Sequence, residues 1–423
     1  MRELNFVSVK DGKLDLNGES NGVSNSSKHQ EYILTEENGK LILTPSIHSL
    51  SRLYIEPTSA CNLNCVTCIR RTWKEAPGFM KMETFTLLLE QIDEFPTLES
   101  IMFGGFGEPM YHPQIFDMIA SLKAKGLKVE ITTNGTMLNE ESFKKLHEAG
   151  LDELWVSIDS TDTTSFNEIR EGAQFDSIYK SLLKIKSINQ ISERKITLGI
   201  AFVATTDNVD QLSNLRNFAR SVFAEKISVS NVLPYDREME EKMLYRKKLV
   251  KSPELVKSEI NRPGWNKILE PLISIPKIDY TEVTKDGLHD VRAGFKMVKL
   301  LNEPYKAYDD YCRFIHERIS FIRWDGMISP CMGLLHSYRT YLNGNERQMN
   351  EYTLGNIKDK TFREIWDSEE YTDFRERVYK FEFSPCVTCG GCKDVNSNET
   401  DCRTTGTPVC GGCLWAQGVI QCP

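Results

Sequence analysis

Between residues 51 and 235, short apolar runs alternate with segments whose apolar residues recur at helical spacing. This alternation indicates repeated strand–helix units, which build a parallel sheet covered by helices. It predicts strands at residues 53–56, 99–103, 128–132, 153–158, 197–203 and 226–232. It predicts helices over Met82–Phe95, Gln114–Lys125, Glu140–Ala149, Thr164–Ile188 and Val209–Ala224, with Asn139 and Asn208 as N-caps. The pattern therefore predicts an α/β protein with a partial (β/α)6 barrel.

The segments on either side of the barrel pattern are of other kinds. Residues 1–50 carry short alternating runs around a polar stretch, which predicts an N-terminal β-ribbon without helices. Residues 236–311 are charged and interrupted by prolines, and we expect a mostly helical linker that covers the substrate. Residues 312–423 form a cysteine-rich C-terminal part. We therefore predict four parts, with the barrel over residues 51–235.

Composition narrows the class of protein. With 423 residues, 40% of them hydrophobic and 26% charged, the chain is an ordinary globular protein. A net charge of −8 argues against a nucleic-acid binder, which would concentrate Lys and Arg on one face. We find neither a signal peptide nor a membrane span in the sequence, and expect a cytoplasmic protein. In that reducing compartment its twelve cysteines are metal ligands more often than disulfides.

Three of these cysteines lie close together directly after the first predicted strand. Cys61, Cys65 and Cys68 have the spacing C-x3-C-x2-C, which lets one short loop direct three sulfurs at one metal centre. A structural zinc site uses four protein ligands, whereas three thiolates on a four-iron cluster leave one iron open for chemistry. The alternatives are a zinc knuckle with a distant fourth ligand, or three thiols without a common partner.

This loop after a strand resembles the signature of the radical S-adenosylmethionine enzymes. The resemblance implies a partial barrel and a [4Fe–4S] cluster on Cys61, Cys65 and Cys68, whose open iron binds S-adenosylmethionine. It also implies reductive cleavage of that cofactor to a 5′-deoxyadenosyl radical, and an oxygen-poor habitat.

The turn Gly104–Pro109, after the second predicted strand, resembles the Gly-Gly-Glu-Pro turn of the same family. The resemblance implies that Gly105 and Gly107 let the backbone approach the cofactor and that Glu108 faces its ammonium group. The alternative is a tight turn with a solvated acid.

Further polar residues follow the fourth predicted strand. Ser157 and Asp159 resemble family positions that contact the methionine carboxylate or the ribose, although Asp159 could equally cap the next helix. Arg170 is a candidate clamp for a carboxylate, the alternative being a solvated surface arginine.

A second field of nine cysteines occupies the C-terminal part: Cys312, Cys331, Cys386, Cys389, Cys392, Cys402, Cys410, Cys413 and Cys422. The spacing from Cys312 through Gly326 to Cys331, with a hairpin turn at Asp325-Gly326, resembles the SPASM extension of peptide- and protein-modifying radical enzymes. Two further four-iron clusters need eight thiolates, so one cysteine is spare. Two zinc sites of four cysteines each are the alternative.

The closing segment Cys413–Pro423 and the turn Gly104–Pro109 resemble one SPASM subgroup, the maturases of tungsten-cofactor oxidoreductases of the aldehyde:ferredoxin type. This implies a partner protein, its peptide or its tungsten–pterin cofactor as substrate, and ferredoxin or flavodoxin as electron donor. Crosslinking of a ribosomal peptide is the alternative within the family. An electron carrier without S-adenosylmethionine chemistry and a zinc-scaffolded interaction protein are alternatives of other classes.

Overall fold

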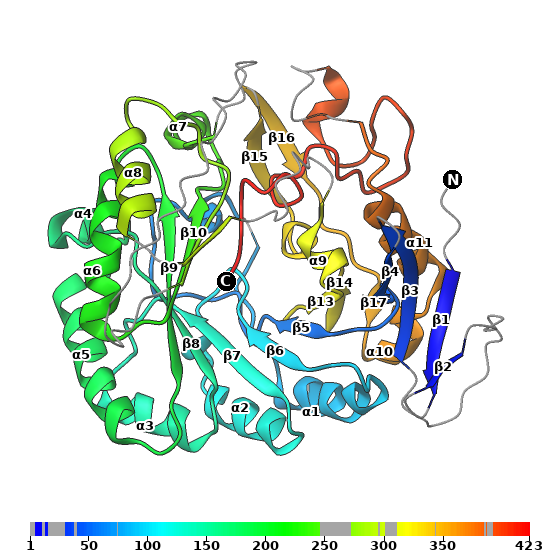
Figure 1. Cartoon of the computed structure of the whole chain (residues 1–423), viewed down its shortest axis with the longest axis horizontal. Helices are drawn as coiled ribbons and strands as arrows, with labels where there is room; N and C mark the ends of the chain where they lie inside the picture. Colours follow the sequence, from blue (N-terminus) through cyan, green and yellow to red (C-terminus); the bar gives the residue numbers. More distant parts are fainter. Residues whose placement is uncertain are drawn as a thin grey trace.

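The computed structural model describes residues 5–10, 13–15, 30–37, 40–73, 75–245, 272–294, 297–300, 311–342, 344–384, 386 and 392–423. Its central feature is an eleven-stranded sheet with the order β12-β11-β10-β9-β8-β7-β6-β5-β13-β14-β17. Every neighbouring pair from β12 to β13 is parallel. Figure 1 shows this sheet curved into an open barrel, with α1, α2, α3, α5 and α6 on its outer side.

All six predicted barrel strands are present. They are β5 (Arg52–Ile55), β6 (Ser100–Phe103), β7 (Lys128–Thr133), β8 (Glu153–Ser157), β9 (Thr197–Ala204) and β10 (Lys226–Asn231). Along the chain each of these strands joins the same edge of the sheet, and an outer helix connects it to the next. This winding brings the carboxyl ends of all six strands to one end of the barrel, where ligands bind in folds of this kind.

The outer helices also follow the predicted segments. They are α1 (Met82–Gln91), α2 (Ile115–Ala124), α3 (Glu140–Glu148) and α6 (Leu212–Val222), with short 3-10 turns η2 (Ile92–Glu94) after α1 and η4 (Val209–Gln211) before α6. Asn139 caps α3 as predicted, because its side chain accepts a hydrogen bond from the Ser142 amide at 2.9 Å. Asn208 does not cap η4; its side chain instead donates to the carbonyls of Asp159 and Val203.

One predicted helix, Thr164–Ile188, is broken into two. The structure has α4 (Thr163–Ile169) and α5 (Phe175–Ile191), separated by a turn in which Gly172 has φ +97°. A side chain at Gly172 would lie 3.1 Å from Leu63 in the cysteine loop. The break thus makes room for a segment that is distant in sequence, which helical periodicity alone does not reveal.

The segment after β10 differs from the mostly helical linker predicted for residues 236–311. Its described part holds α7 (Arg237–Lys242) and α8 (Lys285–Gly294), but also β11 (Leu272–Ile275) and β12 (Met297–Leu300). These two strands extend the parallel sheet beyond β10, with Ile227 paired to Ile273 and Ile273 to Val298. The sheet of the barrel is therefore wider than the six predicted strands.

The C-terminal part is continuous with the same sheet. The predicted hairpin is present as β13 (Ile319–Ile322) and β14 (Met327–Ser329), and β13 pairs in parallel with β5. A second hairpin, β15 (Tyr338–Leu342) and β16 (Asn345–Met349), lies above the barrel in Figure 1. The remaining elements are α9 (Arg313–His316), η5 (Met332–Leu334), β17 (Gly355–Asn356), α10 (Phe362–Trp366), α11 (Glu369–Lys380) and η6 (Lys393–Asn396).

At the N-terminus the expected β-ribbon is an antiparallel sheet of four strands in the order β2-β1-β3-β4. The strands are β1 (Asn5–Lys10), β2 (Lys13–Asp15), β3 (Gln30–Glu37) and β4 (Lys40–Pro45). In Figure 1 this sheet lies on the opposite side of the molecule from α5 and α6, away from the inside of the barrel.

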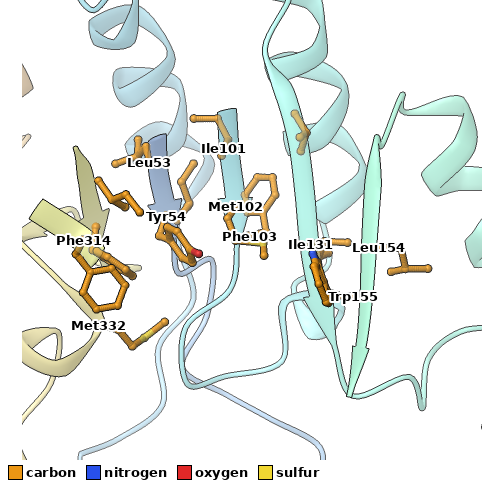
Figure 2. Packing of buried hydrophobic residues seen from close by; sticks show 14 of the residues in the cluster. Leu53, Tyr54, Ile101, Met102, Phe103, Ile131, Leu154, Trp155, Phe314 and Met332 are labelled. Atoms are coloured by element: carbon orange, nitrogen blue, oxygen red, sulfur yellow. The ribbon is translucent and has the colours of Figure 1, made fainter. Parts of the chain in front are cut away.

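The barrel is stabilised by apolar layers on both faces of its strands. Figure 2 shows Leu53 and Tyr54, neighbours on β5, pointing away from each other, as the two-residue period of a strand requires. Toward the amino ends of the strands, buried Glu130 pairs with Arg52 at 2.9 Å and buried Glu153 pairs with Lys226 at 2.7 Å. This end of the barrel is thus occupied by paired charges, and the carboxyl ends of the strands are left for chemistry.

The segment Gly418–Pro423 runs along the inside of the barrel, where Figure 1 marks the C-terminus. The Gln421 amide donates to the Ser230 hydroxyl at 3.1 Å, and the Tyr54 hydroxyl donates to the Pro423 carbonyl at 2.8 Å. These bonds attach the segment to β10 and β5.

No helix in the part of the chain that the structure describes combines the length and the apolar character needed to cross a bilayer.

Candidate functional site

The predicted cysteine loop lies at the carboxyl end of β5. Cys61, Cys65 and Cys68 are all partly buried, and the 3-10 turn η1 (Ile69–Thr72) begins directly after Cys68. The Cys68 amide donates to the Cys65 carbonyl at 3.2 Å, so the chain between these two cysteines forms a tight turn. The loop stands at the end of the barrel where ligands bind in parallel α/β folds.

Hydrogen bonds to the loop backbone, two of them from segments distant in sequence, hold the loop in place. The Val66 amide donates to the Ile169 carbonyl at 2.8 Å, at the end of α4. The Tyr235 hydroxyl donates to the Val66 carbonyl at 2.5 Å, and Arg71 Nε donates to the Cys65 carbonyl at 3.1 Å. These bonds fix the course of the loop backbone that carries the three sulfurs.

Hydrogen-bond donors are directed at one of the sulfurs. The Leu63 amide lies 3.4 Å from Cys61 Sγ, and Asn134 Nδ2 lies 3.7 Å from the same atom. Burial raises the pKa of Cys65 to about 11, although the nearby Arg170 guanidinium opposes the shift. A thiol in this position is neutral until a metal displaces its proton. Donors directed at sulfur are also the usual outer contacts of a metal-bound thiolate, so the loop fits an iron–sulfur ligand set.

The glycine-rich turn packs directly against the chain that leads into the loop. Gly105 has φ +111°, and a side chain there would lie 2.6 Å from the Glu56 side chain. A side chain at Gly107 would lie 2.0 Å from the Thr58 carbonyl oxygen. The Glu108 amide donates to the Ala60 carbonyl at 2.8 Å. The two predicted glycines are therefore needed for close packing of one backbone on another.

The Glu108 carboxylate is occupied by protein donors. It is 2% exposed and accepts hydrogen bonds from the Thr133 hydroxyl at 2.7 Å, the Asn134 amide at 2.6 Å and the Met110 amide at 3.0 Å. Burial raises the pKa of this carboxyl group, and these bonds lower it in part. The sequence-based expectation was a carboxylate facing an ammonium group. In the structure it joins the ends of β6 and β7.

Two further predicted residues form a buried ion pair. Arg170 Nη2 lies 2.8 Å from Asp159 Oδ2, and Asp159 Oδ1 accepts the Val203 amide at 2.9 Å. Asp159 is not the cap of the next helix, because Asp162 caps α4 through the Ser165 amide. Arg170 Nε is buried without a hydrogen-bond partner among the described residues. This donor lies near Cys65 and Cys68, which fits an acceptor bound in the loop.

Ser157 ends β8 and is partly exposed. Of the six residues predicted to contact S-adenosylmethionine, Gly105, Gly107 and Glu108 thus form the turn beside the loop. Asp159 and Arg170 form an ion pair within electrostatic range of Cys65 in the loop. Their roles toward the cofactor stay predictions.

A buried histidine connects the second cysteine field to this site. His336 is fully buried; its Nε2 lies 2.8 Å from Glu56 Oε2 and its Nδ1 lies 3.2 Å from Glu75 Oε2. The Trp73 ring packs on the imidazole with centroids 4.4 Å apart. Glu56 Oε1 also accepts the Phe106 amide at 3.1 Å. The His336–Glu56 pair thus joins the C-terminal part to the glycine-rich turn.

Four cysteines of the second field form what we call the inner set: Cys312, Cys331, Cys410 and Cys413. Cys413 acts on the pKa of each of the other three, so the four sulfurs lie within electrostatic range of one another. Burial raises the pKa of Cys312 to about 12, and it raises those of Cys331 and Cys410 well above the usual thiol range. Buried neutral thiols gathered in this way are suited to bind a metal centre.

Cys386, Cys392 and Cys402 form a second group, here called the outer set. Cys392 and Cys402 both act on the pKa of Cys386, and burial raises that pKa. Cys389, predicted as a ligand beside them, lies outside the described residues. Cys422 lies apart from both sets, beside Tyr54, Trp415 and Arg313. No cysteine is among the main groups that shift the pKa of Cys422, but which of the nine cysteines is spare stays a prediction.

A buried cation lies between the two sets. Arg347 is 2% exposed, and Cys413, Cys386 and Cys410 are within electrostatic range of its guanidinium. No carboxylate pairs with it among the described residues. A buried cation needs nearby negative charge, and thiolates with a bound cluster supply it.

No three His, Cys, Asp or Glu side chains in the described ranges are arranged to hold a single metal ion.

A cavity of about 480 Å³ lies at the opposite end of the barrel, lined by Ser51, Arg52, Ser100, Ile319 and other residues. These residues stand at the amino ends of β5, β6 and β13, away from every cysteine of the loop. We assign it no part in the chemistry.

Sequence reasoning missed several residues of this region. Glu56 carries a signal, since a charged residue directly follows a buried strand there. Asn134 was not missed in the same way, because the run Thr132–Gly135 at the end of a predicted strand resembles family positions that contact the methionine carboxylate or the ribose; its bond toward Cys61 was not predicted. His336 and Arg347 carry no local signal, because only the tertiary fold places them beside cysteines or acids.

Comparisons with known proteins agree with this geometry. A model of the Radical SAM superfamily matches residues 55–219, and a model of SPASM, an iron–sulfur cluster-binding domain, matches residues 312–393. The chain is 30% identical over 378 residues to the tungsten-containing aldehyde ferredoxin oxidoreductase cofactor-modifying protein of Pyrococcus furiosus. The match covers 88% of this chain and 96% of that protein.

Solved structures share the fold at low sequence identity. The protein anSMEcpe with bound AdoMet is 18% identical, with a TM-score of 0.54 over 87% of this chain and 94% of that one. Streptococcus suis SuiB bound to the precursor peptide SuiA is 16% identical, with a TM-score of 0.52 over 81% of this chain and 70% of that one. Because the cysteine loop and the second cysteine field begin inside the matched domains, the chain belongs to the Radical SAM superfamily, as an enzyme with a C-terminal SPASM domain whose cofactors are iron–sulfur clusters and S-adenosylmethionine.

Proposed function

We propose that this enzyme is a maturase that modifies a tungsten-containing oxidoreductase of the aldehyde ferredoxin type, or the tungsten–pterin cofactor of that enzyme. One observation carries the proposal: the 30% identity to the Pyrococcus furiosus cofactor-modifying protein extends over 96% of that protein's length. An identity of this extent includes the barrel and the second cysteine field together, so it concerns more than the shared radical chemistry.

Cys61, Cys65 and Cys68 are the proposed ligands of the first cluster. When bound, this cluster supplies the electron that splits S-adenosylmethionine into methionine and a 5′-deoxyadenosyl radical. Asn134 and the Leu63 amide orient Cys61 through its sulfur, and Tyr235 and Arg71 hold the loop backbone. Arg170 offers its free Nε donor to an anionic group beside the loop. Glu108 fixes the glycine-rich turn from within the protein.

The inner set and the outer set are the proposed ligands of two auxiliary clusters, with Cys389 completing the outer one. We propose a low-potential carrier such as ferredoxin or flavodoxin as the electron donor. The substrate would be the partner oxidoreductase, a peptide of it, or its cofactor during maturation.

Radical chemistry is tested first with the full chain reconstituted anaerobically with iron and sulfide. Addition of S-adenosylmethionine and dithionite is expected to release 5′-deoxyadenosine, and Cys65→Ala to abolish this release. Cys386→Ala is the matched control, because it removes a ligand of the outer set and should leave the cleavage intact. Intact clusters without 5′-deoxyadenosine would instead favour an electron carrier, and a colourless, zinc-loaded protein would favour an interaction scaffold.

The substrate is tested by coexpression with a tungsten-containing oxidoreductase. The expected result is that the oxidoreductase gains activity with the wild-type maturase and not with Cys65→Ala or Cys386→Ala. An oxidoreductase that is equally active with all three would exclude the maturase role.

Crosslinking of a ribosomal peptide is the second candidate, and the fold likeness to SuiB with its bound peptide favours it. The structural match covers 70% of SuiB. Mass spectrometry of a precursor peptide encoded beside the enzyme would show the loss of hydrogen atoms in this case, while oxidoreductase activity would not depend on the enzyme.

A further inference from the structure

Arg347 is placed so that one charge contacts both cysteine loops of the C-terminal part. It lies on β16, and its Nη1 donates to the Gly412 carbonyl at 2.5 Å, between Cys410 and Cys413 of the inner set. Its Nε and Nη2 donate to the Ser397 carbonyl at 3.3 and 3.2 Å, in the chain that follows Cys392 of the outer set. The guanidinium therefore joins the two loops directly.

The packing around Arg347 leaves little freedom for this arrangement to change. A side chain at Gly412 would lie 2.4 Å from Arg347 Nη1, so only glycine admits the guanidinium there. A side chain at Gly411 would lie 1.8 Å from the Ser384 carbonyl oxygen, and the Ser384 hydroxyl is 3.1 Å from Cys402 Sγ. The inner and outer sets are thus adjacent, with Arg347 between them.

The partners of Arg347 are unusual for a buried cation. Described residues offer it carbonyl oxygens and no carboxylate, and it is 2% exposed. Taking an ion out of water is unfavourable unless opposite charge is near. Cys410 and Cys413 on one side and Cys386 on the other are the groups that can supply this charge once they are thiolates.

We propose that Arg347 is a shared positioning residue that sets the reduction potentials of both auxiliary clusters at once. This inference rests on the proposed assignment of the inner and outer sets to two clusters. A four-iron cluster with four thiolates carries a charge of about −2 when oxidised and −3 after it accepts one electron from a low-potential donor. A fixed positive charge in a site of low dielectric stabilises the more negative form, and the potential of each cluster rises.

The experiment compares reduction potentials in the full chain, with Cys61, Cys65 and Cys68 replaced by alanine so that only the auxiliary clusters give a signal. Arg347→Met removes the charge, and Arg347→Lys keeps it. Redox titration with dithionite, followed by electron paramagnetic resonance, is expected to show both auxiliary potentials shifted to more negative values in Arg347→Met. Arg347→Lys is expected to lie close to the parent protein.

Arg375 provides the matched control. It is as deeply buried as Arg347, but it packs on Trp366 and Tyr371, with its charge 4.0 and 4.6 Å from their ring centroids, and donates to the Trp366 carbonyl at 2.9 Å. Arg375→Met should leave both potentials unchanged.

The proposal would be overturned by unchanged potentials in Arg347→Met with full iron content, by a shift of one cluster alone, or by equal shifts in the Met and Lys variants. Loss of iron in both Arg347 variants would show a purely structural arginine and would also overturn it. A parent protein without auxiliary iron–sulfur signals would contradict the proposed function instead, so the two failures are distinguishable.

Discussion

His336 shows how one side chain can attach the C-terminal part to the barrel. Burial lowers the pKa of its imidazole, but hydrogen bonding to Glu56 and Glu75 outweighs burial, and the pKa is raised overall. Arg323 is the charged neighbour that opposes these carboxylates. The folded protein therefore holds the imidazolium more strongly than the unfolded chain does.

This sign predicts a pH dependence of stability. The stabilisation from His336 is fully present below about pH 6.5, the ordinary histidine pKa, and is lost as the pH rises through the raised pKa of the folded state. His336→Gln should cost about 3 kcal/mol at the acidic end of this window, because Glu56 is left buried without its partner. Urea unfolding at a series of pH values measures the difference.

Glu75→Gln is the control, because Glu75 is 47% exposed and its pair with His336 is worth less than about 1 kcal/mol. A stability difference between the wild type and His336→Gln that does not change with pH would contradict the assignment of a charged pair.

The glycines of the turn Gly104–Pro109 differ in what a methyl group would meet. At Gly107 the methyl carbon would lie 2.0 Å from the Thr58 carbonyl oxygen, a backbone atom that cannot move without shifting the approach to Cys61. At Gly104 the nearest atom is 3.8 Å away, which is ordinary contact. Two substitutions in one turn thus have different expected outcomes.

Gly107→Ala is expected to destabilise the protein by about 3 kcal/mol and to abolish 5′-deoxyadenosine formation, because overpacking displaces the cysteine loop. Gly104→Ala should change the stability by less than about 1 kcal/mol and retain the activity. Thermal unfolding and product analysis of the pair are the measurements. Equal behaviour of the two variants would refute the close packing of the turn on residues 58–60.

At the scale of secondary-structure elements, the break between α4 and α5 is explained by the cysteine loop, which packs against it. The end of α4 accepts the Val66 amide, and Gly172 passes beside Leu63. The Val66 carbonyl accepts a hydrogen bond from the hydroxyl of Tyr235, which follows β10. The loop is therefore held between elements that are separate in sequence, and its order depends on all of them.

Tyr235→Phe should lower the free energy of unfolding by about 1 kcal/mol, the usual contribution of one hydrogen bond. It should also speed the loss of iron from the first cluster to a chelator, since the Val66 carbonyl loses its donor. Tyr341→Phe is the control, because the Tyr341 hydroxyl donates to Glu346 at 2.7 Å on the exposed face of the hairpin β15–β16. Identical iron loss from both variants would exclude a role for Tyr235 in holding the loop.

Over the whole molecule, eleven of the twelve cysteines divide into the loop, the inner set, the outer set and Cys422, and Cys389 lies outside the described residues. The inner set draws on residues as far apart as Cys312 and Cys413, so it forms only when the C-terminal part has folded. Cys422 lies on the segment inside the barrel, where its carbonyl accepts Arg313 Nη1 at 2.6 Å. This division predicts how iron content responds to single substitutions.

The wild type should bind about twelve irons, four in each of three clusters. Cys410→Ser and Cys386→Ser should each bind about eight, whereas Cys422→Ser should retain about twelve. Iron and sulfide analysis of the reconstituted proteins measures this. Loss of four irons from Cys422→Ser would show that Cys422 is a ligand and that another cysteine is the spare one.

Much of the fold could be predicted because patterns within short stretches of sequence indicate individual strands, helices and turns. The six strands β5 to β10 carry apolar runs, and the hairpin β13–β14 carries an Asp-Gly turn, so each is visible within a few residues. The strands β11 and β12 were missed because they lie in a charged segment broken by prolines. The helix α4–α5 was predicted as one because its periodicity continues across a break that the cysteine loop requires.

The sequence by itself indicated the chemistry of the first site, because three thiols within eight residues can be directed at one metal centre by a single short loop. It also determined the parallel α/β class, since strand and helix periods are local properties of the chain. Only the tertiary structure decided which distant cysteines gather, that Asp159 pairs with Arg170, and that His336 and Arg347 become buried charges beside acids and thiols. Such long-range contacts depend on how the elements pack, and no short stretch of sequence records that packing.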